Sequence, residues 1–298
     1  MGILITPTTK VLVQGITGKE GQKASVAMRE YGTNVVGGVR PGKGGENVDG
    51  VLVFNSVAEA LHTHPDISVT TVFVPPFAAK AAILEAIEAG IPQINAIVER
   101  IPIKDTAYCL AAAKEKNIRI IGPSSLGYIT PGVGRIGVVG GPKAQADEIF
   151  APGNVGIISR SGGMTNEVSW QVRKAGLGQS TAVHVGGDLL MSTTYADLLQ
   201  LFEKDEQTKA VIIFGEHGGS YEFEIVDLIN TKGYTKPLAI YIGGKFASIL
   251  PEGMNVGHAG AIVERGKGAA EKEQVLRDVG VMIADRYEEL VELVKPFV

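Results

Sequence analysis

KVLVQGITGKEG, residues 10–21, is the part of this 298-residue chain that most clearly predicts its fold class. Its first half is a short apolar run that ends on a glycine, which predicts a buried strand followed by a tight turn. The chain then continues into an amphipathic pattern over residues 22–31 and a second apolar run over residues 34–39. A strand, a glycine-rich turn, a helix and another strand are the opening of a doubly wound α/β sheet.

The same alternation of apolar runs and amphipathic stretches extends over most of the chain. Further strands are expected at residues 68–74, 94–98, 118–121, 155–159, 181–185, 210–214 and 238–242. Further helices are expected at residues 77–89, 106–116, 166–175, 195–203, 221–231, 271–279 and 287–295. This alternation predicts parallel sheets with helices on both faces.

Residues 131–153 interrupt the alternation because they are dense in glycine and proline. Turn residues at such density indicate a boundary between domains. We therefore expect a first domain over residues 1–130, a linker over residues 131–153 and a second domain over residues 154–298. Each domain is long enough to bury a hydrophobic core of its own.

Composition excludes several classes of function. The net charge is −4 and there is no basic block, which argues against nucleic-acid binding. The chain has one cysteine, Cys109, so no intrachain disulfide can form, as is usual in a reducing compartment. No apolar run reaches the ~18 residues of a membrane helix, and the first residues lack the layout of a signal peptide. The composition predicts a cytoplasmic protein without membrane or nucleic-acid partners.

Three glycines, Gly15, Gly18 and Gly21, surround the turn after the first strand. They allow a tight turn and a helix whose free N–H groups face an anion. Their spacing differs from the dinucleotide fingerprint Gly-x-Gly-x-x-Gly. Arg40 also stands where an acidic residue would bind the ribose 2′-hydroxyl of NAD. NAD is therefore disfavoured and another phosphate-bearing nucleotide is favoured, with a plain structural turn as the alternative.

Two further glycine-rich stretches follow strands. Lys43 lies between glycines after the second strand, where a cation on flexible backbone suits a phosphate, although a solvated loop lysine is the alternative. Ser161, Gly162 and Gly163 lead from an apolar strand into a helix whose start can bind phosphate. The sequence contains neither a zinc-type cluster of cysteine and histidine nor the Walker phosphate loop, so no metal is expected on this chain.

GHAGA, residues 257–261, places His258 among residues too small to shield its imidazole. Neutral imidazole is a good nucleophile near pH 7, and a mobile histidine can deliver a group from one place to another. Glu216, between glycines after a strand, could accept a hydrogen bond from that imidazole. His217 competes for this role, but neighbours at a strand end point in opposite directions, which favours His258. The alternative is a glycine-rich turn with an incidental histidine.

With these motifs in this order, the chain resembles the alpha-subunit family of succinyl-CoA synthetase, the ADP/GDP-forming acid–CoA ligases. The shared stretches are VLVQGITG (11–18), PGKGG (41–45), IISRSG (157–162), GGD (186–188), GE-x-GG (215–219) and GHAGAI (257–262). The resemblance covers nearly the whole chain. It implies an α/β fold in which an N-terminal Rossmann-like CoA-binding domain precedes a flavodoxin-like ligase domain that carries the phosphohistidine loop.

The resemblance also implies roles for individual residues. His258 would carry phosphate between two sites, Glu216 would orient it, and the helix start at Ser161, Gly162 and Gly163 would hold the phosphoryl charge. The residues implied to contact coenzyme A are Thr17, Gly18, Lys19, Glu20, Lys43, Ile97, Val98 and Glu99. ATP or GTP with Mg²⁺ would be bound by a separate ATP-grasp beta subunit, in a cytoplasmic hetero-oligomer of the tricarboxylic acid cycle.

Some positions depart from the pattern for succinate. Residues 124–127 are SSLG where the family usually has Asn-Cys-Pro-Gly, and Asn166 replaces a tyrosine. SGGM at residues 161–164 and VVGG at residues 138–141 are more similar to ATP-citrate lyase and citryl-CoA synthetase. Succinate is thus the leading acid substrate, with citrate or malate as the alternative. A non-catalytic CoA-binding regulatory module is a further alternative, against which the joint presence of His258 and Glu216 argues.

Overall fold

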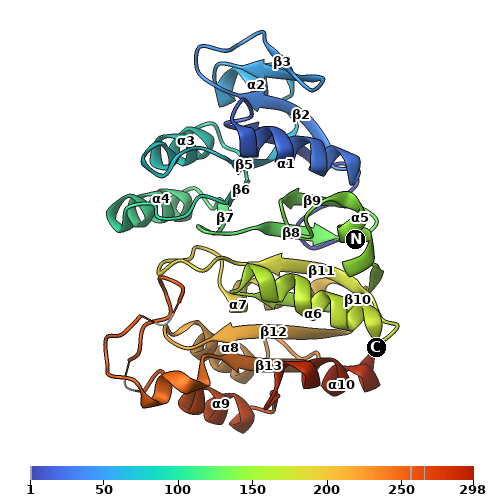
Figure 1. Cartoon of the computed structure of the whole chain (residues 1–298), viewed down its shortest axis with the longest axis vertical. Helices are drawn as coiled ribbons and strands as arrows, with labels where there is room; N and C mark the ends of the chain where they lie inside the picture. Colours follow the sequence, from blue (N-terminus) through green and yellow to red (C-terminus); the bar gives the residue numbers. More distant parts are fainter. Residues whose placement is uncertain (1, 256, 265) are drawn as a thin grey trace.

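The computed structural model describes residues 2–255, 257–264 and 266–298. It shows two α/β units stacked along the long axis of the molecule (Figure 1). Each unit is built on a seven-stranded sheet. No helix in these described ranges is long and apolar enough to cross a membrane.

The first sheet has the strand order β3-β4-β2-β1-β5-β6-β7. Its strands are β1 (Lys10–Gln14), β2 (Asn34–Val39), β3 (Asn47–Val48), β4 (Val51–Phe54), β5 (Ile67–Val72), β6 (Gln93–Ala96) and β7 (Arg119–Ile121). Its helices are α1 (Lys19–Glu30), α2 (Val57–Thr63), α3 (Pro76–Glu88) and α4 (Ile103–Glu115). All neighbouring strands are parallel except β3 and β4. The strand order reverses beside β1, and ligands of open α/β sheets bind outside the carboxyl ends of the strands at such a point.

The second sheet has the strand order β14-β13-β12-β10-β11-β8-β9. Its strands are β8 (Gly127–Thr130), β9 (Gly134–Gly137), β10 (Pro152–Ser159), β11 (Gln179–His184), β12 (Ala210–Glu216), β13 (Leu238–Gly243) and β14 (Met282–Ile283). Its helices are α5 (Lys143–Ile149), α6 (Gly162–Lys174), α7 (Tyr195–Lys204), α8 (Tyr221–Asn230), α9 (Ala269–Asp278) and α10 (Leu290–Val294). Three short 3₁₀ segments are η1 (Lys245–Ile249), η2 (Tyr287–Glu289) and η3 (Lys295–Phe297). The helix expected over residues 287–295 is thus divided into η2, α10 and the start of η3.

The segment 131–153 differs from the linker that its glycine and proline content predicts. It contains β9, α5 and the first residues of β10. β8, inside the expected first domain, pairs antiparallel with both β11 and β9 of the second sheet. A Cβ on Gly127 would overlap the carbonyl of Ile136, so the glycine allows close pairing of the two strands. The chain therefore enters the second sheet at Gly127, through a hairpin that makes this sheet mixed instead of parallel.

The two units share a hydrophobic core. Leu4, Ile5 and Ile121 of the first unit belong to the same buried cluster as Tyr128 and Tyr195 of the second. Burial of apolar surface stabilises this contact at roughly 25 cal/mol per Å² removed from water. A common core fixes the two sheets relative to each other, so that loops of both units can contribute to one site.

Candidate active site

His258 lies on a short hairpin between η1 and α9. The segment that joins these two elements lies at one edge of the molecule (Figure 1). We name it the histidine hairpin, which comprises residues 253–255 and 257–263. Its two legs are joined because Gly253 N donates to Val263 O (2.8 Å) and Val263 N donates to Met254 O (2.9 Å). The side chain of Asn255 donates from Nδ2 to His258 O (2.7 Å). These hydrogen bonds hold the backbone of a glycine-rich segment in one shape.

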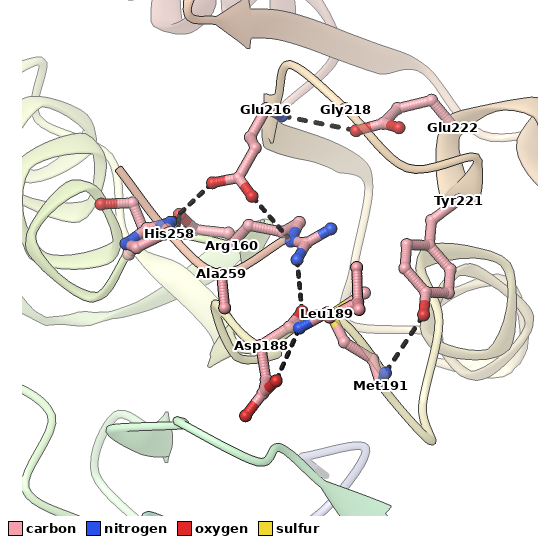
Figure 2. Close-up of polar contacts among 12 residues, drawn as sticks. Arg160, Asp188, Leu189, Met191, Glu216, Gly218, Tyr221, Glu222, His258 and Ala259 are labelled. Atoms are coloured by element: carbon pink, nitrogen blue, oxygen red, sulfur yellow. Dashed lines mark hydrogen bonds and ion pairs between the residues drawn. The ribbon is translucent and has the colours of Figure 1, made fainter. Parts of the chain in front are cut away.

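The imidazole of His258 is paired with the carboxylate of Glu216, the last residue of β12. His258 Nδ1 and Glu216 Oε2 are 2.6 Å apart (Figure 2). Since a carboxylate accepts hydrogen bonds, Nδ1 carries the hydrogen of the neutral ring and Nε2 keeps its lone pair. The side chain of His258 is 41% exposed, so a reactant can reach the ring. The hydrogen bond to Glu216 raises the pKa of His258, and partial burial opposes this shift.

The other oxygen of Glu216 faces Arg160, which directly follows β10. Arg160 Nε and Glu216 Oε1 are 3.4 Å apart, and Arg160 Nη2 donates to Asp188 O (2.7 Å) (Figure 2). Arg160 is fully buried, and its guanidinium lies 5.5 Å from the centre of the Tyr221 ring. Glu216 is therefore held between an imidazole and a guanidinium.

The loop after β12 is anchored by Lys272 of α9. Lys272 Nζ donates to Glu216 O (2.9 Å), Gly218 O (2.6 Å) and Glu222 Oε2 (2.6 Å). Lys272 and Glu222 are both buried. Because α9 follows the histidine hairpin in the chain, this anchor connects the segment that carries His258 to the strand end that carries Glu216.

Two other histidines lie near the pair. His184 donates from Nε2 to Arg160 O (2.9 Å) and accepts from Leu126 N (2.8 Å), and burial lowers its pKa to about 4. It is therefore neutral, with both ring nitrogens engaged. His217 is buried and neither of its ring nitrogens has a partner among the described residues, and burial lowers its pKa. The carboxylate of Glu216 is paired with His258, as the opposite directions of neighbours at a strand end predict.

A chain of backbone contacts leads from His258 to the first unit. The ring of His258 packs on Gly187, where an added Cβ would lie 3.0 Å from Cγ of the imidazole. Gly187 N donates to Ser124 O (3.4 Å), and Ser124 N donates to Val98 O (3.0 Å). Ile97, Val98 and Glu99 follow β6, and the charge of Glu99 acts with Glu216 to raise the pKa of His258. The structure thus brings the end of a first-unit strand close to the histidine.

The start of α6 also lies at this edge. Ser161 is the N-cap residue, and its side chain accepts from Met164 N (3.4 Å). Gly162 and Gly163 form the first turn, whose N–H groups have no acceptor within the helix and favour an anion. A Cβ on Gly162 would overlap the side chain of Leu126, whereas the space beside Gly163 is open.

In the first unit, a cavity of about 520 Å³ lies at the carboxyl ends of β1, β2 and β5. Its lining includes Gly15, Arg40 and Pro75. A Cβ on Gly15 would overlap the carbonyl of Phe73, and its φ of +82° favours glycine. Thr17, Gly18, Lys19 and Glu20 follow Gly15 in the chain at the start of α1, where Gly18 is an N-cap residue without a side-chain hydrogen bond, but none of the four lines the cavity. A cavity at the carboxyl edge of a parallel sheet, whose lining residue Gly15 leads into a helix start with free N–H groups, suits a nucleotide with phosphates.

Lys43 lies in the exposed turn after β2. Asn55 shapes this turn because its Oδ1 accepts from Gly42 N (3.1 Å) and Gly44 N (3.0 Å). Lys43 Nζ forms an exposed ion pair with Glu46 Oε1 at 2.7 Å. Exposed pairs of this kind are weak, so the ammonium can exchange Glu46 for a phosphate.

Four residues that build the site have no role in the sequence analysis: Arg160, Asp188, Lys272 and Asn55. Arg160 and Asp188 stand inside the stretches IISRSG (157–162) and GGD (186–188), and a charged residue directly after an apolar strand is the signal that could have singled out Arg160. Lys272 has no such signal, because a lysine in the first turns of an amphipathic helix is usually exposed.

Comparison with known families defines the class. The family model for the CoA binding domain matches residues 6–100, and the model for the succinyl-CoA ligase like flavodoxin domain matches residues 152–297. The expected order, a CoA-binding domain followed by a flavodoxin-like ligase domain, is thereby confirmed. A CoA-binding unit joined to such a domain defines an acid–CoA ligase.

Relatives that align with nearly the whole chain identify the family. The alpha subunit of ADP-forming succinate–CoA ligase from Aquifex aeolicus is 43% identical over 99% of this chain and 94% of its own length. The alpha subunit of malate–CoA ligase from Methylorubrum extorquens is 41% identical over 95% of this chain and 94% of its own. ATP citrate lyase from Methanosaeta concilii shares the fold, with a TM-score of 0.91 at 24% identity over 99% of this chain and 50% of that one. The chain belongs to the succinate–CoA ligase alpha-subunit family, and it is a ligase of the ADP-forming acid–CoA type.

Proposed function

We propose that this chain forms succinyl-CoA from succinate, coenzyme A and a nucleoside triphosphate, with His258 as the carrier of phosphate. The pairing of His258 Nδ1 with Glu216 at 2.6 Å supports this most strongly, because it leaves Nε2 free on a ring that is 41% exposed. A nucleophilic nitrogen next to an orienting carboxylate is the arrangement that covalent catalysis requires.

The first step is transfer of the terminal phosphoryl group to His258. Nε2 attacks the phosphorus, the bond to the diphosphate oxygen breaks, and the nucleoside diphosphate leaves. The ring gains positive charge in this step, and Glu216 stabilises it through Nδ1. The free N–H groups of the first turn of α6, which follows Ser161, would stabilise the negative charge on the phosphoryl oxygens.

The second step returns His258 to its free state. A carboxylate oxygen of succinate attacks the phosphorus, the phosphorus–nitrogen bond breaks, and an acyl phosphate forms. The thiol, as thiolate, then attacks the acyl carbon and inorganic phosphate leaves. The contacts from Gly187 through Ser124 to Val98 support attack by coenzyme A near His258, because they link the first unit, to which we assign coenzyme A, to the segment that packs on the imidazole.

The chain's own residues would hold coenzyme A along the carboxyl edge of the first sheet. The cavity of about 520 Å³ beside Gly15 and the uncapped start of α1 fit a nucleotide with phosphates. The residues we assign to this contact are Thr17, Gly18, Lys19, Glu20, Lys43, Ile97, Val98 and Glu99. ATP or GTP and its Mg²⁺ would lie on an ATP-grasp beta subunit, since this sequence lacks a Walker phosphate loop and its relative from Aquifex aeolicus is named an alpha subunit.

The test is the formation of a CoA thioester by the complex of this chain with its ATP-binding partner subunit. Succinate, malate and citrate are offered separately with ATP, Mg²⁺ and coenzyme A. We expect succinate to give a kcat/KM at least ~10-fold above that of malate or citrate. Malate and citrate carry a hydroxyl that succinate lacks, and a pocket shaped for succinate would bury this hydroxyl without a hydrogen-bond partner. Thioester formation from citrate or malate alone would contradict succinate as the substrate.

The matched variants are His258→Asn and His62→Asn, of which the second removes an exposed imidazole from α2. We expect His258→Asn to lower thioester formation by roughly 10³-fold or more, as loss of a covalent nucleophile does, and His62→Asn to leave it unchanged. Coenzyme A binding without turnover of any acid in the unmodified complex would instead support the non-catalytic CoA-binding module.

A further inference from the structure

Arg160 contacts three segments of the site around the histidine. Its guanidinium lies 3.4 Å from the carboxylate of Glu216, donates to the carbonyl of Asp188 at 2.7 Å and stacks near the ring of Tyr221. An arginine with 1% exposed area carries a charge that water does not screen. Burial of such a charge costs free energy unless the charge is paired and hydrogen-bonded.

The histidine hairpin rests directly on this guanidinium. Gly260 is buried, and an added Cβ there would overlap Arg160 Nη2. Ala261 N donates to His258 O (3.0 Å), so the residues next to Gly260 also fix the backbone of the histidine. The position of the hairpin is therefore set by its contact with Arg160 as well as by the bond from His258 to Glu216.

We propose that Arg160 is a positioning residue for His258: its guanidinium orients the Glu216 carboxylate and supports the histidine hairpin at Gly260. It acts through Glu216 and the hairpin, and its guanidinium forms an ion pair with Glu216 while it donates a hydrogen bond to the carbonyl of Asp188 on another segment. A lysine lacks the planar fork of a guanidinium and has a compact ammonium, so it does not reproduce the spacing of the two contacts.

The charge of Arg160 also influences the titration of His258. The titratable and charged groups that face this imidazole are Glu216 after β12, Arg160 after β10, Glu99 after β6 and the neutral His184 of β11. Glu216 and Glu99 raise the pKa of His258, and Arg160 lowers it. Arg160 therefore keeps the fraction of neutral, nucleophilic imidazole near pH 7 higher than the two carboxylates alone would allow.

The experiment is an NMR titration of the full chain labelled with ¹⁵N-histidine, which contains five histidines, with His258→Asn used to assign the signal. We expect Arg160→Gln to move the pKa of His258 upward by about 0.5 unit or more, since a nearby positive charge is removed. Arg173→Gln removes an exposed charge from the last turn of α6 and is expected to leave that pKa unchanged. An unchanged pKa in folded Arg160→Gln, with ¹⁵N shifts that keep the hydrogen of the neutral ring on Nδ1, overturns the proposal.

Arg160→Lys keeps the positive charge and provides the second arm if the glutamine variant does not fold. We expect its pKa shift to be smaller, and kcat of the complex with the partner subunit to fall at least ~10-fold without a matching change in KM for ATP. A kcat equal to that of the unmodified complex overturns the positioning role.

This inference rests on the proposed function only for the kinetic arm. The titration needs neither the partner nor turnover. If the unmodified complex fails to phosphorylate His258 while Arg160→Gln still moves its pKa, the proposed function fails and the positioning inference stands.

Discussion

At the scale of single residues, the site depends on the different partners of the two carboxylate oxygens of Glu216. Oε2 accepts from the imidazole of His258, and Oε1 faces the guanidinium of Arg160 (Figure 2). One oxygen thus fixes the tautomer of the ring while the other is fixed by a buried cation. The carboxylate can neither rotate freely nor pick up a proton without losing one of these contacts.

Replacing Glu216 by glutamine should change both the rate and the pH dependence of the reaction. The hydrogen bond to Glu216 raises the pKa of His258, so its loss lowers this pKa toward the ordinary value. Neutral imidazole then persists to a lower pH, and the acid limb of the rate profile moves to lower pH. The maximal rate is expected to fall by about 10²-fold, because the developing imidazolium loses its negative partner. Measurement of kcat against pH for the complex checks both effects.

Glu203→Gln is a suitable control for this change. Glu203 is a carboxylate of α7 that accepts from Thr235 N (3.0 Å) away from the site, so its loss should leave the profile in place. A profile for Glu216→Gln with an unchanged acid limb, or with a limb moved to higher pH, would contradict the role assigned to the carboxylate.

At the scale of elements, α9 connects the histidine hairpin to the strand end that carries Glu216. The sequence predicts the long elements well, because apolar runs such as those of β1 and β12 are buried on both faces. It misses β3, β4 and α2, which are too short to show a clear period. The hairpin around His258 was expected only as a flexible glycine-rich loop, since its bonds depend on the Asn255 side chain and on pairing between its legs.

Lys272→Met should destabilise the second unit. The change leaves Glu222 buried without its partner and frees the carbonyls of Glu216 and Gly218, at a cost of about 3–5 kcal/mol. A thermal melt should show a decrease in Tm on the order of 10 °C. Lys267→Met removes an exposed ion pair with Glu264 and should cost no more than about 1 kcal/mol. Equal melting temperatures for the two variants would show that the anchor contributes no stability.

At the scale of the whole molecule, the site requires both units. The histidine, its carboxylate and Arg160 come from the second unit, whereas Val98 and Ser124 bring in the first through backbone hydrogen bonds. The order of the domains follows from the sequence motifs, because each glycine-rich turn follows a strand and marks a carboxyl edge. The contact between the units could not be predicted in this way. It depends on the shared core around Tyr128 and on the hairpin of β8 and β9, which lies in the segment expected as a linker.

In the proposed function His258 carries phosphate on its way to the acid, and this role is tested by following the phosphate from ATP. The complex of this chain with its partner subunit is incubated with ATP labelled in the terminal phosphate and Mg²⁺, and the labelled peptide is identified by mass spectrometry. We predict an acid-labile, base-stable label on the peptide that contains His258, released as inorganic phosphate when succinate and coenzyme A are added. A label on any other residue, or a label on His258 that succinate and coenzyme A do not release, would contradict the role of His258 as the phosphate carrier.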